Sequence, residues 1–130
     1  MFFYKNPVIP AAGITFTDKG DVDGIDYEIG DLTIDGQWNE LDLSSKVGAA
    51  KVLVCIRAFL DTTVAGKIGK FKTNGSTYNY NSPQIITSVA SKAIAFDIWV
   101  VTDAAGKIEY WFTADLAGTI RLTVAHYFVL

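Results

Sequence analysis

The sequence is poor in the residues that most often carry chemistry. Its 130 residues include one His and one Cys, whereas catalytic and metal sites usually combine several such side chains or clustered carboxylates. A single Cys cannot form a disulfide within the chain, so cysteine content does not indicate a compartment. No phosphate loop, nucleophile elbow or zinc signature is present in the sequence either. We therefore predict a protein that is not an enzyme and needs no cofactor or metal.

Basic clusters and long apolar runs are also missing. The chain holds 11 Lys and Arg against 14 Asp and Glu, for a net charge of −3, and the basic residues are scattered. A nucleic-acid backbone needs a positive face, so no nucleic-acid partner is expected. Every apolar run is shorter than the ~20 residues that cross a bilayer, and residues 1–7 do not resemble a signal peptide. We expect no membrane insertion and synthesis in the cytoplasm without a leader.

Short strands dominate what the sequence does contain. From Asp31 onward, apolar and polar residues alternate with period two between turn residues. Residues 51–60 are apolar on both faces, as expected of a central strand, and no comparable helical period appears. We predict an all-β antiparallel β-sandwich of about eight strands. A jelly roll is the preferred topology, with an immunoglobulin-like fold as the alternative.

Two pairs of turn residues predict hairpins. Residues 32–34 run into Asp35-Gly36, and residues 67–73 run into Asn74-Gly75. The second turn is expected to lead into a strand over 76–80, which Pro83 interrupts before the chain resumes as a strand over 84–90.

The last third of the chain has the clearest alternation. Residues 93–101 and 107–113 read as strands joined by a short turn at 103–106. In the final strand, one face is predicted to carry Ile120, Leu122, Val124, His126 and Phe128. The other face is predicted to carry Thr119, Arg121, Thr123, Ala125 and Tyr127.

The first residues differ from the rest of the chain. Residues 1–17 are predicted to form an extended arm and residues 18–130 a single domain, because Pro7 and Pro10 exclude a helix near the start. The arm carries five apolar side chains that we assign to a candidate assembly interface: Phe2, Phe3, Tyr4, Val8 and Ile9. The arm packs either on its own domain or on a neighbouring chain, and we favour the neighbour, because termini are ordered only when something holds them.

Residues 18–31 form an acidic, glycine-rich loop. Its Asp21-x-Asp23-Gly24 core is faintly similar to a calcium loop, but the regular ligand spacing and the final Glu are missing. A solvated turn region is the favoured interpretation, and Ca²⁺ binding stays open. His126 has no partner on its face of the last strand, and Cys55 lies in an apolar run, so both are predicted to be structural.

Outward-facing tryptophans are the strongest binding signal. Trp99 and Trp111 lie on the faces opposite the apolar stripes of their strands. If these strands pair through the turn at 103–106, the two rings come close together. They would then stack on a sugar, form a subunit contact or be covered by the arm. For the sugar-binding alternative, Tyr78 and Tyr80 would add further stacking surfaces.

Four segments follow one framework pattern: residues 35–45 (DGQWNELDLSS), the apolar run 51–59, Asn74-Gly75 and residues 107–110 (KIEY). Together they resemble small β-sandwich modules of bacteriophage and environmental viral structural proteins, over about residues 31–130. The resemblance implies that Trp38 and Leu41 are core positions. It also implies a virion or appendage module that acts by assembly, often as a trimer.

Two functional hypotheses follow. The first is a non-enzymatic capsid decoration protein, made in the host cytoplasm, that forms a homotrimer and binds a major capsid or other virion protein at the virion surface. The alternative is a carbohydrate- or receptor-binding module of a phage appendage that binds a surface glycan through its exposed aromatic residues. Both hypotheses place the function on surfaces rather than in a catalytic site.

Overall fold

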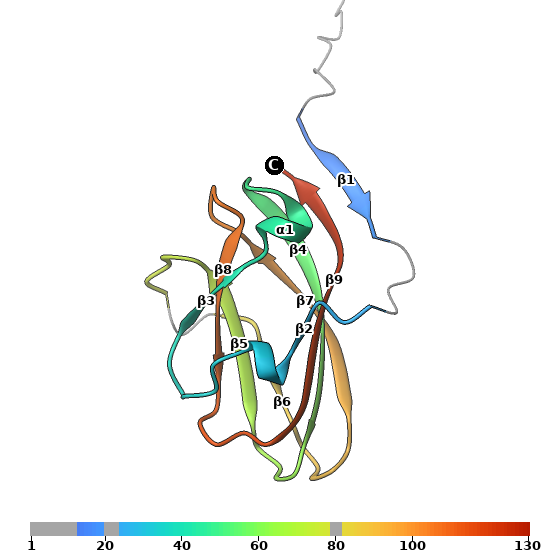
Figure 1. Ribbon diagram of the computed structural model, residues 1–130, viewed down its shortest axis with the longest axis vertical. Helices are drawn as coiled ribbons and strands as arrows, with labels where there is room; N and C mark the ends of the chain where they lie inside the picture. Colours follow the sequence, from blue (N-terminus) through green and yellow to red (C-terminus); the bar gives the residue numbers. More distant parts are fainter. Residues whose placement is uncertain (1–12, 20–23, 79–81) are drawn as a thin grey trace, which may run out of the picture.

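The computed structural model describes residues 13–19, 24–78 and 82–130. Within these residues, nine strands form two antiparallel sheets (Figure 1). The strands are β1 (Thr15–Asp18), β2 (Tyr27–Glu28), β3 (Asn39–Asp42), β4 (Val52–Thr62), β5 (Ile68–Thr73), β6 (Gln84–Ile86), β7 (Ile94–Val101), β8 (Lys107–Phe112) and β9 (Gly118–Val129). A short 3-10 helix, η1 (Ile29–Asp31), and one turn of helix, α1 (Ser44–Val47), connect them. The predicted all-β sandwich is confirmed.

Each sheet is built mostly from strands that are distant in sequence. The first, which we call sheet A, has the order β1-β9-β4-β7, and β2 also pairs with β9. The second, sheet B, has the order β3-β8-β5-β6. Both β1 and β2 pair with β9, at opposite ends of its length, and β1 stands beside the end of β9 that carries the C-terminus (Figure 1).

The core lies between the two sheets and is centred on β4. This strand pairs with both β7 and β9, and its inward side chains are fully buried. They are Val52, Val54, Ile56, Ala58 and Leu60. Sheet B adds Phe71 and Phe112, whose rings meet edge to face with centroids 6.1 Å apart. Full burial of one such large apolar side chain contributes roughly 1.5–3 kcal/mol to stability, so this layer is a major source of the stability of the fold.

A β-bulge in β9 changes the direction of its side chains. Cys55 pairs with His126, whereas the next residue, Ile56, pairs with Val124, so Ala125 is an extra residue in β9. Before the bulge, the predicted alternation is correct. After it, Tyr127 packs against the core, and His126 moves to the outer face. The prediction that His126 and Phe128 share a face with Val124 is therefore wrong, because one inserted residue reverses a period-two pattern.

The first predicted hairpin is not formed. Residues 32–34 are not a strand, and β3 pairs only with β8. The Asp35 carboxylate instead accepts hydrogen bonds from the Gln37 backbone N–H at 3.0 Å and from Asn39 Nδ2 at 2.9 Å. This local bonding lets the side chain of Asp35 shape an Asx turn in place of a strand-to-strand connection.

The second turn, at Asn74-Gly75, is confirmed. Gly75 has a φ of +83°, and its N–H donates to the Glu109 carboxylate at 2.8 Å. The strand that returns to β5 is β6, which begins after Pro83. No strand occurs over 76–78, and residues 79–81 lie outside the described residues, so the predicted position of the returning strand is corrected.

The connection at 103–106 links the two sheets. At the end of β7, the buried Thr102 hydroxyl donates to the Ala50 carbonyl and accepts from the Val52 N–H, which ties this end of sheet A together. The Asp103 carboxylate then accepts the N–H groups of Ala105 and Lys107, each at 2.9 Å. The turn is as predicted, but β8 continues in sheet B instead of pairing with β7.

Substitution of Gly106 tests this connection. Gly106 has a φ of +81°, and an added Cβ would collide with the Gly48 carbonyl oxygen. Gly66 is a matched control, because its φ is +83° and nothing lies within 4 Å of the added atom. We expect Gly66→Ala to lower the free energy of unfolding by about 1 kcal/mol and Gly106→Ala by about 3 kcal/mol. Equal losses in urea unfolding would contradict this packing.

The charge on Asp103 should also affect stability. Hydrogen bonds from the Asn74 side chain and from the Lys107 N–H hold the pKa of Asp103 below its usual value. A lowered pKa adds stability above the unfolded pKa, near 3.9 for Asp, and this contribution is lost as pH falls through the folded value. We expect Asp103→Ala to melt at a lower temperature than wild type at pH 7, and the difference to narrow below about pH 4. A difference that does not change with pH would contradict the assignment.

Candidate functional site

Four aromatic rings gather on the outer side of sheet A. Phe16 comes from β1, His126 and Phe128 come from β9, and Trp99 comes from β7. The Phe16 ring centroid lies 4.9 Å from that of Phe128 and 5.7 Å from that of His126. Trp99 lies 5.2 Å from His126 and 6.2 Å from Phe128. The rings therefore form one continuous cluster across three strands of the sheet.

Beneath these rings lie the outward side chains of β4. Cys55 stands between Trp99 and His126 in the register, and Leu53 is opposite Phe128. Strands two positions apart in a sheet are separated by roughly 10 Å, yet the rings of Trp99 and His126 approach to 5.2 Å. The small Cys55 side chain allows the rings to lean over it, which leaves Cys55 only 1% exposed.

We call this cluster the outer aromatic face. Its members are Phe16, Leu53, Cys55, Trp99, His126 and Phe128. Phe16 is 53% exposed and Trp99 is 43% exposed, so the two ends of the cluster remain open to solvent. Ile14, which precedes β1, is 66% exposed and extends the apolar surface beyond the edge of the sheet. Large exposed apolar side chains that touch one another mark interaction surfaces more often than isolated ones do.

The other half of the same sheet face mixes charged and apolar side chains. Arg57 forms an ion pair with Asp97, with 3.0 Å between Nε and Oδ1, and Arg121 lies over the Phe59 ring at 5.3 Å. Arg57, Phe59 and Arg121 line a shallow hollow of about 290 Å³, and the apolar Ile25 and Ala95 line it as well. The Arg57–Asp97 pair is half exposed, so solvent screens it and its contribution to stability is small. The outer surface of sheet A is therefore mixed in this half, and its aromatic side chains are densest at the end near β1.

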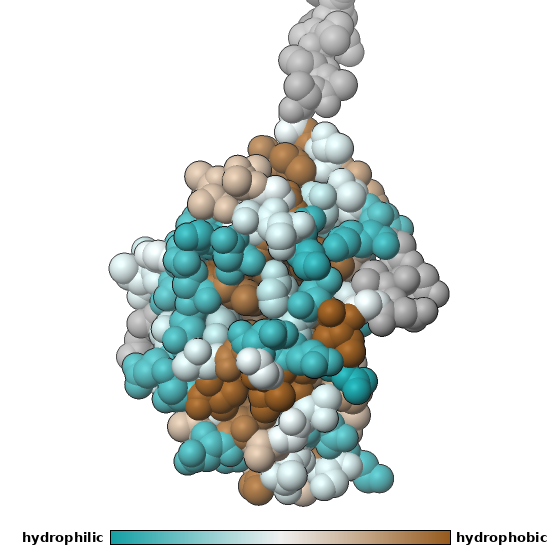
Figure 2. Space-filling model, viewed as in Figure 1, coloured by the Kyte–Doolittle hydropathy of each residue, from teal (hydrophilic) through white to brown (hydrophobic). Residues whose placement is uncertain are grey.

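Sheet B presents a charged outer surface. Lys107 Nζ lies 3.1 Å from the Glu40 carboxylate, and Lys72 Nζ lies 3.9 Å from that of Glu109. Lys70 covers the Trp111 ring at 4.5 Å from its centroid. Figure 2 shows one side of the molecule, where hydrophilic side chains separate several apolar patches, one of them at the end near β1 and the C-terminus. The two sheets thus differ in the chemistry that they offer to a partner.

Trp38 belongs to this charged surface. Its ring lies 4.4 Å from Lys72 Nζ, and it is only half-buried, whereas Leu41 is part of the core. Trp38 precedes the short β3 and lies on the outer side of sheet B, where it covers the Lys72 side chain. The expectation from the resemblance is therefore met for Leu41 and wrong for Trp38.

The predicted pairing of Trp99 with Trp111 is wrong. Trp99 lies in β7 of sheet A and Trp111 in β8 of sheet B, because the connection at 103–106 crosses between the sheets. Trp111 instead stacks with Lys70. Tyr78 is 78% exposed in the loop after β5, and Tyr80 lies outside the described residues. Of the rings assigned to sugar stacking that the structure describes, Trp111 therefore lies apart, whereas Trp99 and Tyr78 line a common hollow.

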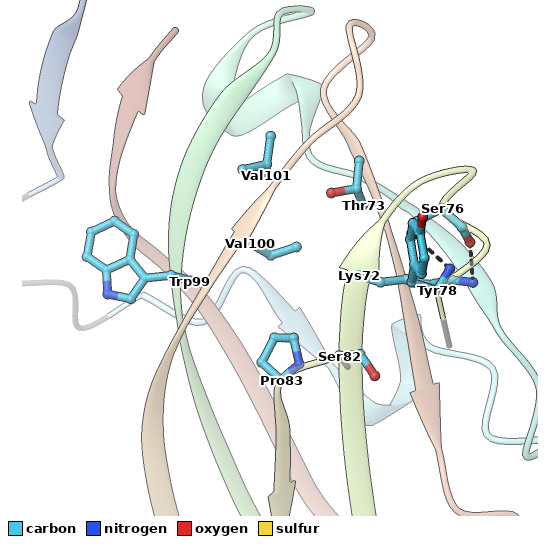
Figure 3. A pocket seen from close by; sticks show the side chains of 9 residues that line it. All are labelled: Lys72, Thr73, Ser76, Tyr78, Ser82, Pro83, Trp99, Val100 and Val101. Carbon is cyan, nitrogen blue, oxygen red and sulfur yellow. Dashed lines mark hydrogen bonds between the residues drawn. The ribbon is translucent and has the colours of Figure 1, made fainter. Parts of the chain in front are cut away.

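A second hollow, of about 240 Å³, lies between β5 and β7. Tyr78 and Trp99 both line it, but their rings do not face each other. Figure 3 shows the Trp99 indole on one side of the β7 ribbon, while Tyr78 and Lys72 lie toward β5. The Lys72 ammonium in this region already donates to the Ser76 carbonyl oxygen at 2.7 Å. This arrangement offers a ligand two exposed rings that do not face each other, rather than an aromatic clamp.

Asp26, in the described part of the loop at 18–31, has a structural role. Asp26 accepts the Val124 N–H at 2.7 Å and pairs with Lys46 at 3.4 Å. Asp21 and Asp23, the residues that would bind Ca²⁺ in the open alternative, lie outside the described residues. In the part of the chain that is described, no group of three or more His, Cys, Asp and Glu side chains could hold a metal ion. No helix of that part is long and apolar enough to cross a membrane.

The arm residues assigned to assembly are only partly placed. Residues 15–17 of the predicted arm belong to β1, which pairs with β9 of the same chain. Phe2, Phe3, Tyr4, Val8 and Ile9 all lie outside the described residues. Sequence reasoning missed Phe16 and Phe128 as surface residues. The period of the apolar positions could not reveal the bulge at Ala125, which turns Phe128 outward.

Two comparisons with known proteins identified no relative of this chain. A scan against protein-family models found no matching family, and a search of curated proteins found no match.

The reactivity of the Cys55 thiol tests whether the Trp99 and His126 rings shield it from solvent. Burial raises the pKa of the Cys55 thiol, and the nearby Asp97 adds to this effect, so little reactive thiolate forms near neutral pH. In a Ser88→Cys variant, we expect Cys55 to react with a chromogenic disulfide reagent at least about tenfold more slowly than the exposed new thiol. Adding Trp99→Ala should accelerate Cys55, whereas adding Trp111→Ala should not. Equal rates for the two thiols would contradict the cover.

Proposed function

We propose that this protein is a non-enzymatic structural protein that acts by assembly, as a decoration protein on the surface of a virus particle. The observation that carries the proposal is the contrast between the two outer surfaces. Sheet A exposes the outer aromatic face, including Phe16 and Trp99, whereas the outer side of sheet B carries the partly exposed Lys107–Glu40 pair and the largely buried Lys72–Glu109 pair. Aromatic residues are enriched in protein interfaces, and charged residues are depleted from interface cores. A protein with one sheet toward a partner and the other toward water fits a decoration role.

The strand order supports the same setting. Strands β2 to β9 form the facing sets β2-β9-β4-β7 and β3-β8-β5-β6. We interpret this order as an eight-stranded jelly roll with β1 as an additional edge strand. Jelly rolls are common in viral capsid proteins and also in lectins, so the fold alone is compatible with either hypothesis. The resemblance of residues 31–130 to phage and environmental viral modules favours the virion.

A homotrimer is the assembly that we propose for the free protein, with a major capsid or other virion protein as the second partner. A standard interface covers roughly 800 Å² of each partner, and the whole chain has a surface of 7428 Å². An interface of ordinary size would therefore occupy about a tenth of each subunit.

The sugar-binding alternative has weaker support from the geometry. The rings of Trp99 and Trp111 lie on different sheets, so they cannot stack on one sugar. A glycan-binding protein would show a saturable change in tryptophan fluorescence across a panel of surface glycans. Such a change, lost in Trp99→Ala, would favour the alternative over assembly.

Solution mass tests the assembly part. Light scattering coupled to size exclusion should give three times the 14.2 kDa of one chain. Loss of a central interface tryptophan costs about 2 kcal/mol or more, which is roughly thirtyfold in the dissociation constant. We therefore expect Trp99→Ala to dissociate at concentrations where wild type and Trp111→Ala remain associated. A monomeric wild type at all concentrations would contradict assembly through this face.

Whether the protein lies on the surface of a virus particle needs a separate measurement. Antibodies raised against the chain should label intact virus particles purified from the source sample on a density gradient. Recovery of the chain only in particle-free fractions would contradict a decoration role, even if the free protein forms a trimer.

A further inference from the structure

We propose that the outer aromatic face is the binding surface for the N-terminal segment, residues 2–9, of a second copy of this chain. The inference rests on the proposed function and deepens it, because it names the element that covers the face. It begins from the size of the face. Phe16 and Trp99, each about half exposed, leave on the order of 100 Å² of exposed area apiece, since an aromatic side chain offers roughly 150–250 Å² in total. A face this narrow suits an extended segment better than a broad globular surface.

The composition of the N-terminal segment matches the face. Residues 2–9 (FFYKNPVI) contain three aromatic and two aliphatic side chains and one charge, Lys5. Pro7 and Pro10 disfavour a helix and favour extended backbone at the residues before them. Because the prolines restrict the backbone, the segment loses less conformational entropy on binding than a fully flexible segment would. The segment can therefore present its aromatic residues along a sheet surface as a strand or polyproline-like stretch.

The position at which the segment leaves the fold favours a second copy. Thr15 pairs with Val129 at the end of β9, and Phe16 pairs with Phe128. The chain before Thr15 thus leaves β1 past the last residues of β9, at the edge of the outer aromatic face. To cover its own face, the segment would have to reverse direction within a few residues and cross over β1. A neighbouring subunit can receive it without this reversal.

The length of the segment is sufficient. Twelve residues precede Gly13 in the sequence, and an extended chain advances about 3.3 Å per residue, so these residues reach roughly 40 Å. The four strands of sheet A span roughly 15 Å at the usual spacing. A segment that leaves one subunit can therefore cross the whole outer aromatic face of the next. When each subunit binds the next one in this way, the contact is head-to-tail, and three copies can close a ring.

A mixing experiment tests the proposal with full-length chains. The segment variant carries Phe2→Ser, Phe3→Ser and Tyr4→Ser, and the face variant carries Phe16→Ala and Trp99→Ala. We expect each variant alone to have the mass of one chain. A mixture should form a 1:1 pair, because the intact segment of the face variant can bind the intact face of the segment variant. Matched Trp111→Ala should leave the wild-type mass unchanged.

Three other results of the mixing experiment would contradict either this inference or the proposed self-assembly. If the segment variant keeps the wild-type mass, assembly stands and this inference fails. If neither variant assembles and the mixture stays monomeric, the segment packs on its own chain and the inference fails. If the wild type itself is monomeric, the proposed self-assembly fails first. Circular dichroism melting of each variant confirms that a loss of mass is not a loss of fold.

Photocrosslinking keeps the proposal testable if the variants do not fold. Benzoylphenylalanine in place of Phe3, in an otherwise unchanged chain, should give a covalent product of twice the chain mass. Mass spectrometry should place the crosslink on the peptide that contains Trp99 or Phe128. The same probe at Ile86, which is 49% exposed on sheet B, should give no such product. Crosslinks from position 3 that remain within one chain would overturn the proposal.

Discussion

The pairing of β4 with β9 determines what each side of this protein presents. The two strands run together along all of β4, and one extra residue, Ala125, interrupts their register. Before this bulge, β9 directs Ile120, Leu122 and Val124 into the core. After it, Tyr127 and Val129 take the inward positions, and His126 and Phe128 face outward. If Ala125 were instead paired as an ordinary strand residue, His126 and Phe128 would point inward, and the outer aromatic face would lose two of its four rings.

Strand β4 also explains why the rings of the outer aromatic face pack closely together. Cys55 is the smallest outward residue of β4, and it lies where Trp99 and His126 flank it from both sides. The two rings close over it, and Phe128 and Phe16 continue the cluster toward β1. A sulfur atom in this place is thus a packing element, and the sole cysteine needs no chemical role. On sheet B, by contrast, Trp111 and Trp38 each contact a lysine ammonium group, Lys70 and Lys72 respectively, instead of another ring.

Period-two patterns in the sequence were sufficient to predict the architecture. The run 51–60 is the central strand β4, and the residues around Ile98, Ile108 and Ile120 form strands with one buried face. The patterns could not show that the turn at 103–106 crosses between sheets, because a tight turn has the same sequence in a hairpin and in a sheet-to-sheet connection. They also could not show the bulge, since Ala125 fits an inward or an outward position equally well. Both errors fell on Trp99, His126 and Phe128, the residues of the candidate site.

If another copy of the chain covers the outer aromatic face, Trp99 must become less accessible to solvent as the chains associate. The most direct measurement is the fluorescence of Trp99 alone, in a chain whose Trp38 and Trp111 are replaced by Phe, followed over a wide range of protein concentration. We expect its emission to move to shorter wavelength, and acrylamide to quench it less, as the chains associate. Emission and quenching that stay constant while light scattering records association would show that the subunits meet elsewhere and would contradict the account.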